Sequence, residues 1–114
     1  MKREVCFLIG ANDEVLWSDV SSSPLALPDS RARWEAIWSR REALVEIAHS
    51  HPLGPEAFSE EDRSTMAALD DALGRKVRFS LVTPTQYLVR DEGDAAVPAE
   101  APAWVAAMRS ASGL

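Results

Sequence analysis

The middle of the sequence most constrains what this chain can fold into. Residues 43–51 are mostly apolar and predict a strand, and Pro52-Leu53-Gly54-Pro55 cannot continue it and must form a loop. A helix is predicted to begin at Ser59, with apolar side chains three and four residues apart and Gly74 as its C-cap. Residues 77–83 predict another strand. The predicted order of this segment is therefore strand, loop, helix and strand.

Further elements are predicted before this segment. Residues 4–20 form a hairpin with strands at 5–9 and 15–17, and residues 21–30, which hold two prolines, form a loop. Residues 30–42 predict a helix. Its apolar face carries Trp34, Ile37 and Trp38, which we expect to anchor the core because large aromatic side chains dominate small cores.

The last third of the chain completes the predicted order. Residues 86–90 form a strand, and residues 91–101, rich in Ala, Pro and acid, form a poorly packed linker. A short final helix begins near Pro102, with Trp104 as its expected anchor. The domain prediction is a core over residues 1–90 and a tail over residues 91–114 that belongs to the same domain.

Composition excludes several classes of protein. A chain of 114 residues has room for one domain. Its net charge of −6, without a basic stripe, argues against nucleic acid as a partner. Cys6 is the only cysteine, which excludes an internal disulfide and a zinc site made of cysteines. The first apolar run is too short to predict a signal peptide, and no segment is long enough to cross a membrane. We therefore expect a soluble, cytoplasmic protein.

The two histidines of the chain, His49 and His51, fall at the end of one predicted strand. Because side chains alternate along a strand, both rings point to the same face and can converge on one metal ion. Asp62, in the first turn of the following helix, is the best candidate for the third ligand. Hydrolysis at such a site also needs a donor for the oxyanion, for which Ser59 is the candidate.

The general base must be a residue other than the metal ligands, and three glutamates are candidates: Glu4, Glu14 and Glu46. Glu46 stands three residues before His49, so strand parity predicts that it faces away from the metal.

His49-Ser50-His51-Pro52, followed by Gly54 and Ser59-Glu60-Glu61-Asp62, resembles the motif of the JAB/MPN family in its zinc metalloprotease (JAMM) form. The spacings match, with seven residues between His51 and Ser59 and ten between His51 and Asp62. The resemblance implies an α/β fold, with a mixed sheet flanked by helices, related in layout to the cytidine-deaminase fold.

The resemblance also implies the role of each residue. His49, His51 and Asp62 bind Zn²⁺ together with a water, and Ser59 helps to hold that water or the tetrahedral intermediate. Glu4 is the general base, because Glu4-Val5-Cys6 is similar to the start of the family's first strand; Glu14 fits this position less well.

The sequence departs from the family pattern at some positions. Phe7 and Glu46 stand where the family usually has Gly, and the family's first helix does not precede Glu4. An ordinary structural explanation also exists for part of the motif, since Ser59 and Asp62 have the spacing of a helix capping box. Cys6 is interpreted as a small apolar filler of a buried strand.

The expected function follows from the resemblance. It is a zinc-dependent peptidase or isopeptidase that hydrolyses the bond after the C-terminal glycine of a ubiquitin-like protein. The small size resembles bacterial stand-alone members, so E1- and E2-like enzymes of a conjugation or anti-phage system are further expected partners. Two alternatives stay open at this point: a non-catalytic MPN-like scaffold, and a zinc hydrolase of small peptides.

Overall fold

A computed structural model describes residues 2–21, 23 and 30–114 of the chain. Six strands form one sheet in the order β2-β1-β3-β4-β5-β6. The strands are β1 (Val5–Ile9), β2 (Val15–Val20), β3 (Glu46–Ser50), β4 (Arg78–Val82), β5 (Tyr87–Arg90) and β6 (Ala96–Pro98). The helices are α1 (Arg31–Ser39), α2 (Glu60–Leu73) and α3 (Trp104–Ala111), with the 3-10 turn η1 (Ala11–Asp13) between β1 and β2.

The sheet is mixed because only one pair of neighbouring strands is parallel. β3 and β4 run parallel and are connected through α2, whereas β1 is antiparallel to both β2 and β3. β4, β5 and β6 form an antiparallel meander. The predicted α/β class, with a mixed sheet flanked by helices, is confirmed.

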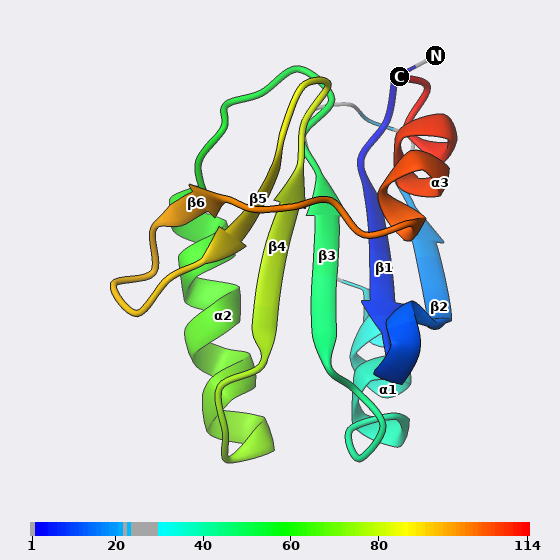
Figure 1. Ribbon diagram of the computed structural model, residues 1–114. Helices are drawn as coiled ribbons and strands as arrows, with labels where there is room; N and C mark the ends of the chain where they lie inside the picture. The colour runs from blue at the N-terminus through cyan, green and yellow to red at the C-terminus, as the bar shows by residue number, and fades with distance from the viewer. Residues whose placement is uncertain (1, 22, 24–29) are drawn as a thin grey trace.

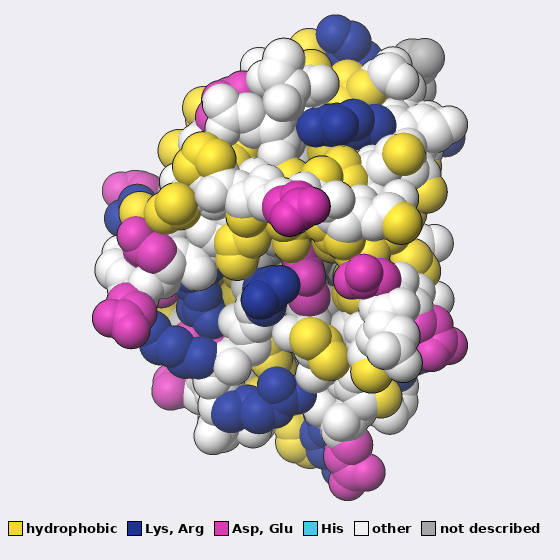
Figure 2. All heavy atoms as spheres, in the orientation of Figure 1, with side chains coloured by type: hydrophobic (Ala, Val, Ile, Leu, Met, Phe, Trp, Pro, Cys, Tyr) yellow, Lys and Arg dark blue, Asp and Glu magenta, His cyan; other side chains and the backbone are white. Residues whose placement is uncertain are grey.

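Helices cover both faces of the sheet (Figure 1), with α1 and α2 on one face and α3 on the other. Two buried clusters match these layers. The first joins Ile37 of α1 and Met66 and Leu69 of α2 to the sheet, and the second joins α3 to the opposite face. On the α3 face, acidic and basic side chains are interspersed rather than gathered by sign, and no histidine is visible (Figure 2).

The helix predicted from Ser59 to Gly74 is confirmed with both of its caps. The Ser59 hydroxyl accepts a hydrogen bond from the backbone N–H of Asp62 at 3.0 Å. Gly74 has φ +68°, a left-handed conformation that favours glycine at a helix C-terminus. No described helix is both long and apolar enough to cross a membrane.

Three local predictions are corrected by the structure. Trp38 is 52% exposed and lies against the guanidinium of Arg41 rather than in the core. The third strand begins at Glu46 rather than Ala43, because Arg40 to Ala43 form turns after α1. The linker predicted over residues 91–101 contains β6. Most of the loop predicted over residues 21–30 lies outside the described residues.

β6 forms because the chain reverses direction immediately before it. The Asp91 carboxylate accepts hydrogen bonds from the backbone N–H groups of Gly93 and Ala95, both at 2.9 Å. This turn brings Val97 opposite Val89. Pro98 is tolerated because it ends a strand at the edge of the sheet, where a missing N–H costs little.

The final helix packs firmly on the sheet. Trp104 is 4% exposed, and its ring lies 5.6 Å from that of Tyr87 and 6.2 Å from that of Phe7. The backbone carbonyl of Ser112, just after α3, accepts from the N–H of Arg3 at 3.0 Å, so the two ends of the chain lie together.

We predict that Trp104→Ala lowers the free energy of unfolding by about 3 kcal/mol, because it leaves a large cavity under α3. Urea denaturation measures the change, and limited proteolysis reports whether residues 91–114 loosen. Trp38→Ala is the matched control and should change stability by less than about 0.5 kcal/mol, since that ring is half exposed. Equal effects of the two substitutions would contradict this account of the core.

Candidate metal centre

Two histidines and one aspartate converge where β3 ends and α2 begins. The Nε2 atoms of His49 and His51 lie 3.1 Å apart. One oxygen of Asp62 lies 3.2 Å from Nε2 of His49, and the other lies 3.4 Å from Nε2 of His51. The structure thus brings together the three residues that were predicted as metal ligands.

The spacing of the two rings suits a tetrahedral ion. Ligand atoms about 2.0–2.1 Å from a tetrahedral zinc ion are separated from one another by roughly 3.3–3.4 Å. The separation of 3.1 Å between the two ring nitrogens lies within a few tenths of an ångström of such an edge, and each Asp62 oxygen contacts a different ring, at 3.2 and 3.4 Å. Two imidazole nitrogens and one carboxylate are also a ligand set that zinc uses in catalytic sites, where a fourth position stays open.

Glu4 reaches the same place from the neighbouring strand. Cys6 pairs with His49 in the antiparallel register of β1 and β3, so Glu4, two residues earlier, comes opposite His51. Possible ligand atoms of Glu4, His49 and His51 all lie within 4.8 Å of one another. The Glu4 side chain is therefore placed either to act as a base at the centre or to be a ligand itself.

The other two candidate glutamates lie elsewhere. Glu14 is exposed and follows η1, outside the cleft that contains the histidines. Glu46 faces the other side of the sheet, where it accepts hydrogen bonds from the hydroxyls of Ser80 and Tyr87, the latter at 2.7 Å. The parity argument for Glu46 is confirmed by these contacts.

His51 is held by the loop that follows it. Its Nδ1–H donates to the backbone carbonyl of Pro55 at 3.0 Å. In the neutral ring, this bond leaves the lone pair on Nε2, the atom that faces Asp62, so the ring is oriented for metal binding. Gly54 has φ +78°, and this turn of the loop therefore favours glycine.

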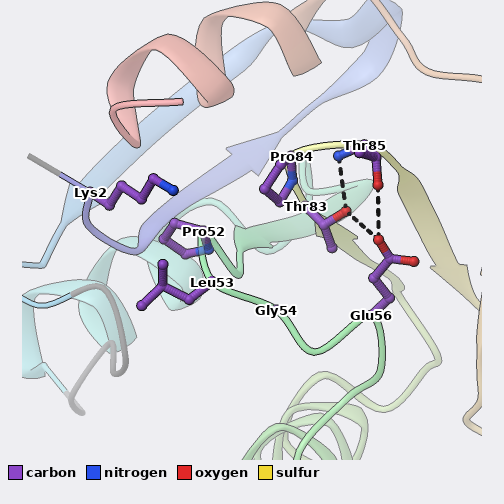
Figure 3. A pocket seen from close by; sticks show the side chains of 8 residues that line it. All are labelled: Lys2, Pro52, Leu53, Gly54, Glu56, Thr83, Pro84 and Thr85. Atoms are coloured by element: carbon purple, nitrogen blue, oxygen red, sulfur yellow. Dashed lines mark hydrogen bonds between the residues drawn. The ribbon is translucent and has the colours of Figure 1, made fainter.

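A second contact fixes the far side of this loop. One oxygen of Glu56 accepts from the hydroxyls of Thr85 at 2.9 Å and Thr83 at 3.3 Å (Figure 3). Glu56 and the two threonines line a hollow of about 420 Å³ that has neither histidine in its lining. This contact attaches the loop that carries the Pro55 carbonyl to the turn between β4 and β5.

Ser59 and Asp62 form a capping box and also belong to the centre. One Asp62 oxygen accepts from the backbone N–H of Ser59 at 2.8 Å, in addition to its contact with His51. The Ser59 hydroxyl accepts from the N–H of Asp62, so its own hydrogen stays available to donate into the cleft. Asp62 can therefore be both a capping residue and a candidate metal ligand, because the cap fixes the carboxylate that faces both rings.

Burial and charge act in opposite directions on the ionisable groups. Burial raises the pKa of the Glu4 carboxyl, and the nearby histidines only partly counteract it. For Asp62, burial also raises the pKa, but hydrogen bonds from His49 and His51 outweigh it and hold the pKa well below its usual range. The pKa of His51 is raised, because its hydrogen bonds to Asp62 and Pro55 outweigh its burial.

All five predicted site residues line one cleft of about 680 Å³ between α1 and α2. Analysis of the sequence missed Arg33 and Ile37 of α1 as parts of this cleft. Neither residue type indicates a cleft, because arginine and isoleucine are common on any amphipathic helix. Only the packing of α1 against the sheet brings these two side chains to the cleft.

Cys6 also lines the cleft, but it is an unreactive thiol. The side chain is 2% exposed, and burial raises its pKa to about 12. The thiolate is the reactive form, so the folded protein holds almost none of it at neutral pH. This agrees with its interpretation as a small apolar filler.

We predict that iodoacetamide at pH 8 alkylates Cys6 at least about 100-fold more slowly in the folded chain than in urea, where the pKa of the thiol returns to about 8.5. The same difference makes stability depend on pH. The thiol contributes fully below pH 8.5, and the contribution is lost as the pH rises toward 12. Rapid alkylation of the folded chain would contradict the burial described here.

The sequence matches the family described as prokaryotic homologs of the JAB domain over residues 1–92. The chain belongs to this family. No curated protein matches the sequence significantly. The match spans β1 to β5, including every residue that meets at the candidate metal centre. The JAB family includes metalloisopeptidases as well as scaffold domains, so the donor set described above must decide which kind this JAB domain is.

Proposed function

We propose that this JAB domain is a zinc-dependent peptidase that cuts the bond after the C-terminal glycine of a ubiquitin-like protein. The observation that carries the proposal is the meeting of three ligand groups in one cleft, with two imidazole nitrogens 3.1 Å apart, a carboxylate that contacts both rings, and a buried glutamate beside them. A domain that serves only as a scaffold has no need to keep this set of groups together.

In this proposal His49, His51 and Asp62 hold the zinc ion. A bound zinc ion lowers the pKa of a water toward about 7 and polarises a substrate carbonyl. The Pro55 carbonyl keeps His51 in the tautomer that binds, and the backbone N–H of Ser59 holds one Asp62 oxygen in place. The loop and the helix N-terminus thus fix the ligands before the metal arrives.

Glu4 transfers the proton of the reaction, and Ser59 donates a hydrogen bond to the oxyanion. Glu4 takes a proton from the attacking water as the new carbon–oxygen bond forms, and then gives it to the leaving amine as the carbon–nitrogen bond breaks. Its buried position beside the two histidines favours this role, since burial raises the pKa of its carboxyl. The Ser59 hydroxyl donates to the oxyanion at the cleft wall.

The test is cleavage of fusion proteins by the zinc-loaded chain. A panel of ubiquitin-like proteins, each fused through its terminal glycine to a reporter, is incubated with the enzyme, and the products are sized by mass spectrometry. The expected product ends at that glycine and does not form when a chelator is present. If no fusion in the panel is cut, the proposal fails, and the scaffold alternative takes its place.

A second comparison separates the proposal from the remaining alternative. Short peptides that end in the same residues are tested beside the whole fusions. Much faster cleavage of the fusions than of the peptides supports recognition of a folded ubiquitin-like protein. E1- and E2-like enzymes that act on the same protein are then further proposed partners. Equal rates would instead favour a zinc hydrolase of small peptides.

A further inference from the structure

Ser50 stands between His49 and His51 in the chain, but its side chain points to the other face of the sheet. Side chains alternate along a strand, so His49 faces the cleft and Ser50 faces α3. Ser50 is fully buried. Its hydroxyl accepts hydrogen bonds from the backbone N–H of Val5 at 2.9 Å and from the hydroxyl of Ser112 at 2.6 Å. The strand that leads into the histidines is therefore joined to the segment that follows α3.

The Ser50 hydroxyl connects β1 to β3 at the point where the pairing of the two strands ends. Cys6 and His49 are the terminal pair of that ladder. Beyond this pair, the N–H of Val5 donates to the side chain of Ser50, while the N–H of His51 donates to the neighbouring strand β4. A side-chain hydroxyl thus spans the separation between β1 and β3 at the level of the candidate metal centre.

Ser112 holds the chain on both sides of Glu4, the proposed general base. Its carbonyl accepts from the backbone N–H of Arg3 at 3.0 Å. Its hydroxyl donates to the same Ser50 oxygen that accepts from the N–H of Val5. Ser112 is itself fully buried, and Figure 1 shows the two ends of the chain together beside α3. Both neighbours of Glu4 are therefore fixed from the face of the sheet opposite the cleft.

We propose that Ser112 is a positioning residue for the general base and that it acts through Ser50. The inference deepens the proposed function and rests on it, because it explains how the Glu4 carboxylate is held beside the two histidines. Such placement matters, since a shift of about 1 Å can lower a rate by about 100-fold. Ser112 lies beyond residues 1–92, the part of the chain that matches the JAB family. The segment after α3 therefore supports the site from behind the sheet.

The first test is amide hydrogen exchange, which needs no turnover. The reporter is the amide of Val5, and the amide of Leu8 in the middle of β1 corrects for global unfolding. We expect the ratio of the Val5 rate to the Leu8 rate to rise at least about tenfold in Ser50→Ala and at least about threefold in Ser112→Ala. Ser110→Ala is the matched control, because Ser110 is an exposed serine of α3, and it should leave the ratio unchanged.

The second test is a double-mutant cycle in the cleavage of a fusion by fully folded, zinc-loaded protein. We expect kcat to fall by about tenfold in Ser50→Ala and by about threefold in Ser112→Ala, with KM within about twofold of the wild type. The double variant should have the kcat of Ser50→Ala, since Ser112 acts through Ser50. A purely structural role of the two serines would lower stability and leave the kcat of the folded protein unchanged.

An unchanged exchange ratio in Ser112→Ala, an unchanged kcat in that variant, or multiplied losses of kcat in the double variant would overturn the inference. Its failure is distinguishable from the failure of the proposed function. Cleavage of fusions together with an unchanged Val5 amide in Ser112→Ala contradicts the inference alone. A raised exchange ratio in both variants, without cleavage of any fusion by the wild type, contradicts the peptidase alone.

Discussion

Glu4→Gln is expected to keep the zinc ion and to lose the hydrolysis. The amide has nearly the shape of the carboxylate but cannot take a proton from water, so the cleavage rate should fall by about 10²- to 10⁴-fold. The three proposed ligands are untouched, because Glu4 lies just before β1. His49 lies on β3, His51 directly follows that strand, and Asp62 lies in α2. The measurement is the initial rate of fusion cleavage at saturating zinc, together with the zinc content of the same sample.

Glu14→Gln is the matched control for this experiment. Glu14 is an exposed glutamate after the hairpin turn and lines no part of the cleft, so its substitution should leave the rate unchanged. If Glu4→Gln instead lost its zinc, Glu4 would be a ligand rather than the base. If both variants kept full activity, the assignment of the base to Glu4 would be wrong.

Asp62 caps α2 and is also the proposed third zinc ligand, and a set of substitutions should separate these two roles. Asp62→Ala removes both a ligand and half of the capping box, so we expect zinc affinity to fall by more than about 100-fold and stability by about 1 kcal/mol. Asp62→Asn keeps an oxygen that can accept from the Ser59 N–H but removes the charge, so zinc affinity should fall with less loss of stability.

Ser59→Ala should lower stability and leave zinc affinity nearly unchanged. It removes the hydroxyl that accepts from the Asp62 N–H, at a cost of about 1 kcal/mol, and leaves the carboxylate facing both histidines. Zinc titration with a competing chelator measures affinity, and urea denaturation of the metal-free chains measures stability. Zinc affinity that falls as far in Ser59→Ala as in Asp62→Ala would mean that Asp62 acts through the cap and not as a ligand.

The parts of the site that could be predicted from sequence were those fixed by local geometry. His49 and His51 share a face because a strand has a period of two, and Ser59 and Asp62 meet because they are one helical turn apart. The choice of Glu4 depended on the family resemblance. Its position opposite His51 comes from the pairing of β1 with β3, and strand register across two loops is not written in either segment alone.

The predictions that failed depended on tertiary packing. The spacing of Trp34, Ile37 and Trp38 correctly indicated one apolar face of a helix, but only Ile37 points fully into the core. Trp38 lies at the edge of that face, and its aromatic ring packs against the Arg41 guanidinium instead. β6 was missed because Ala and Pro have little preference for strands. The pairing of Val97 with Val89 outweighs this low preference.

The cleft between α1 and α2 could not be predicted, for a related reason. Residues such as Ile37, Met66 and Phe79 predict a buried core in any helix or strand. Whether two helices pack closely or leave space between them depends on the side chains of all the elements at once, and no single pattern reports it.

We propose that one zinc ion binds between His49, His51 and Asp62. Elemental analysis of the purified protein tests it most directly, with dialysis against buffered zinc before the measurement. The account predicts close to one zinc ion per chain. No bound zinc after this treatment would contradict it, and would leave the capping box as the only role of Ser59 and Asp62.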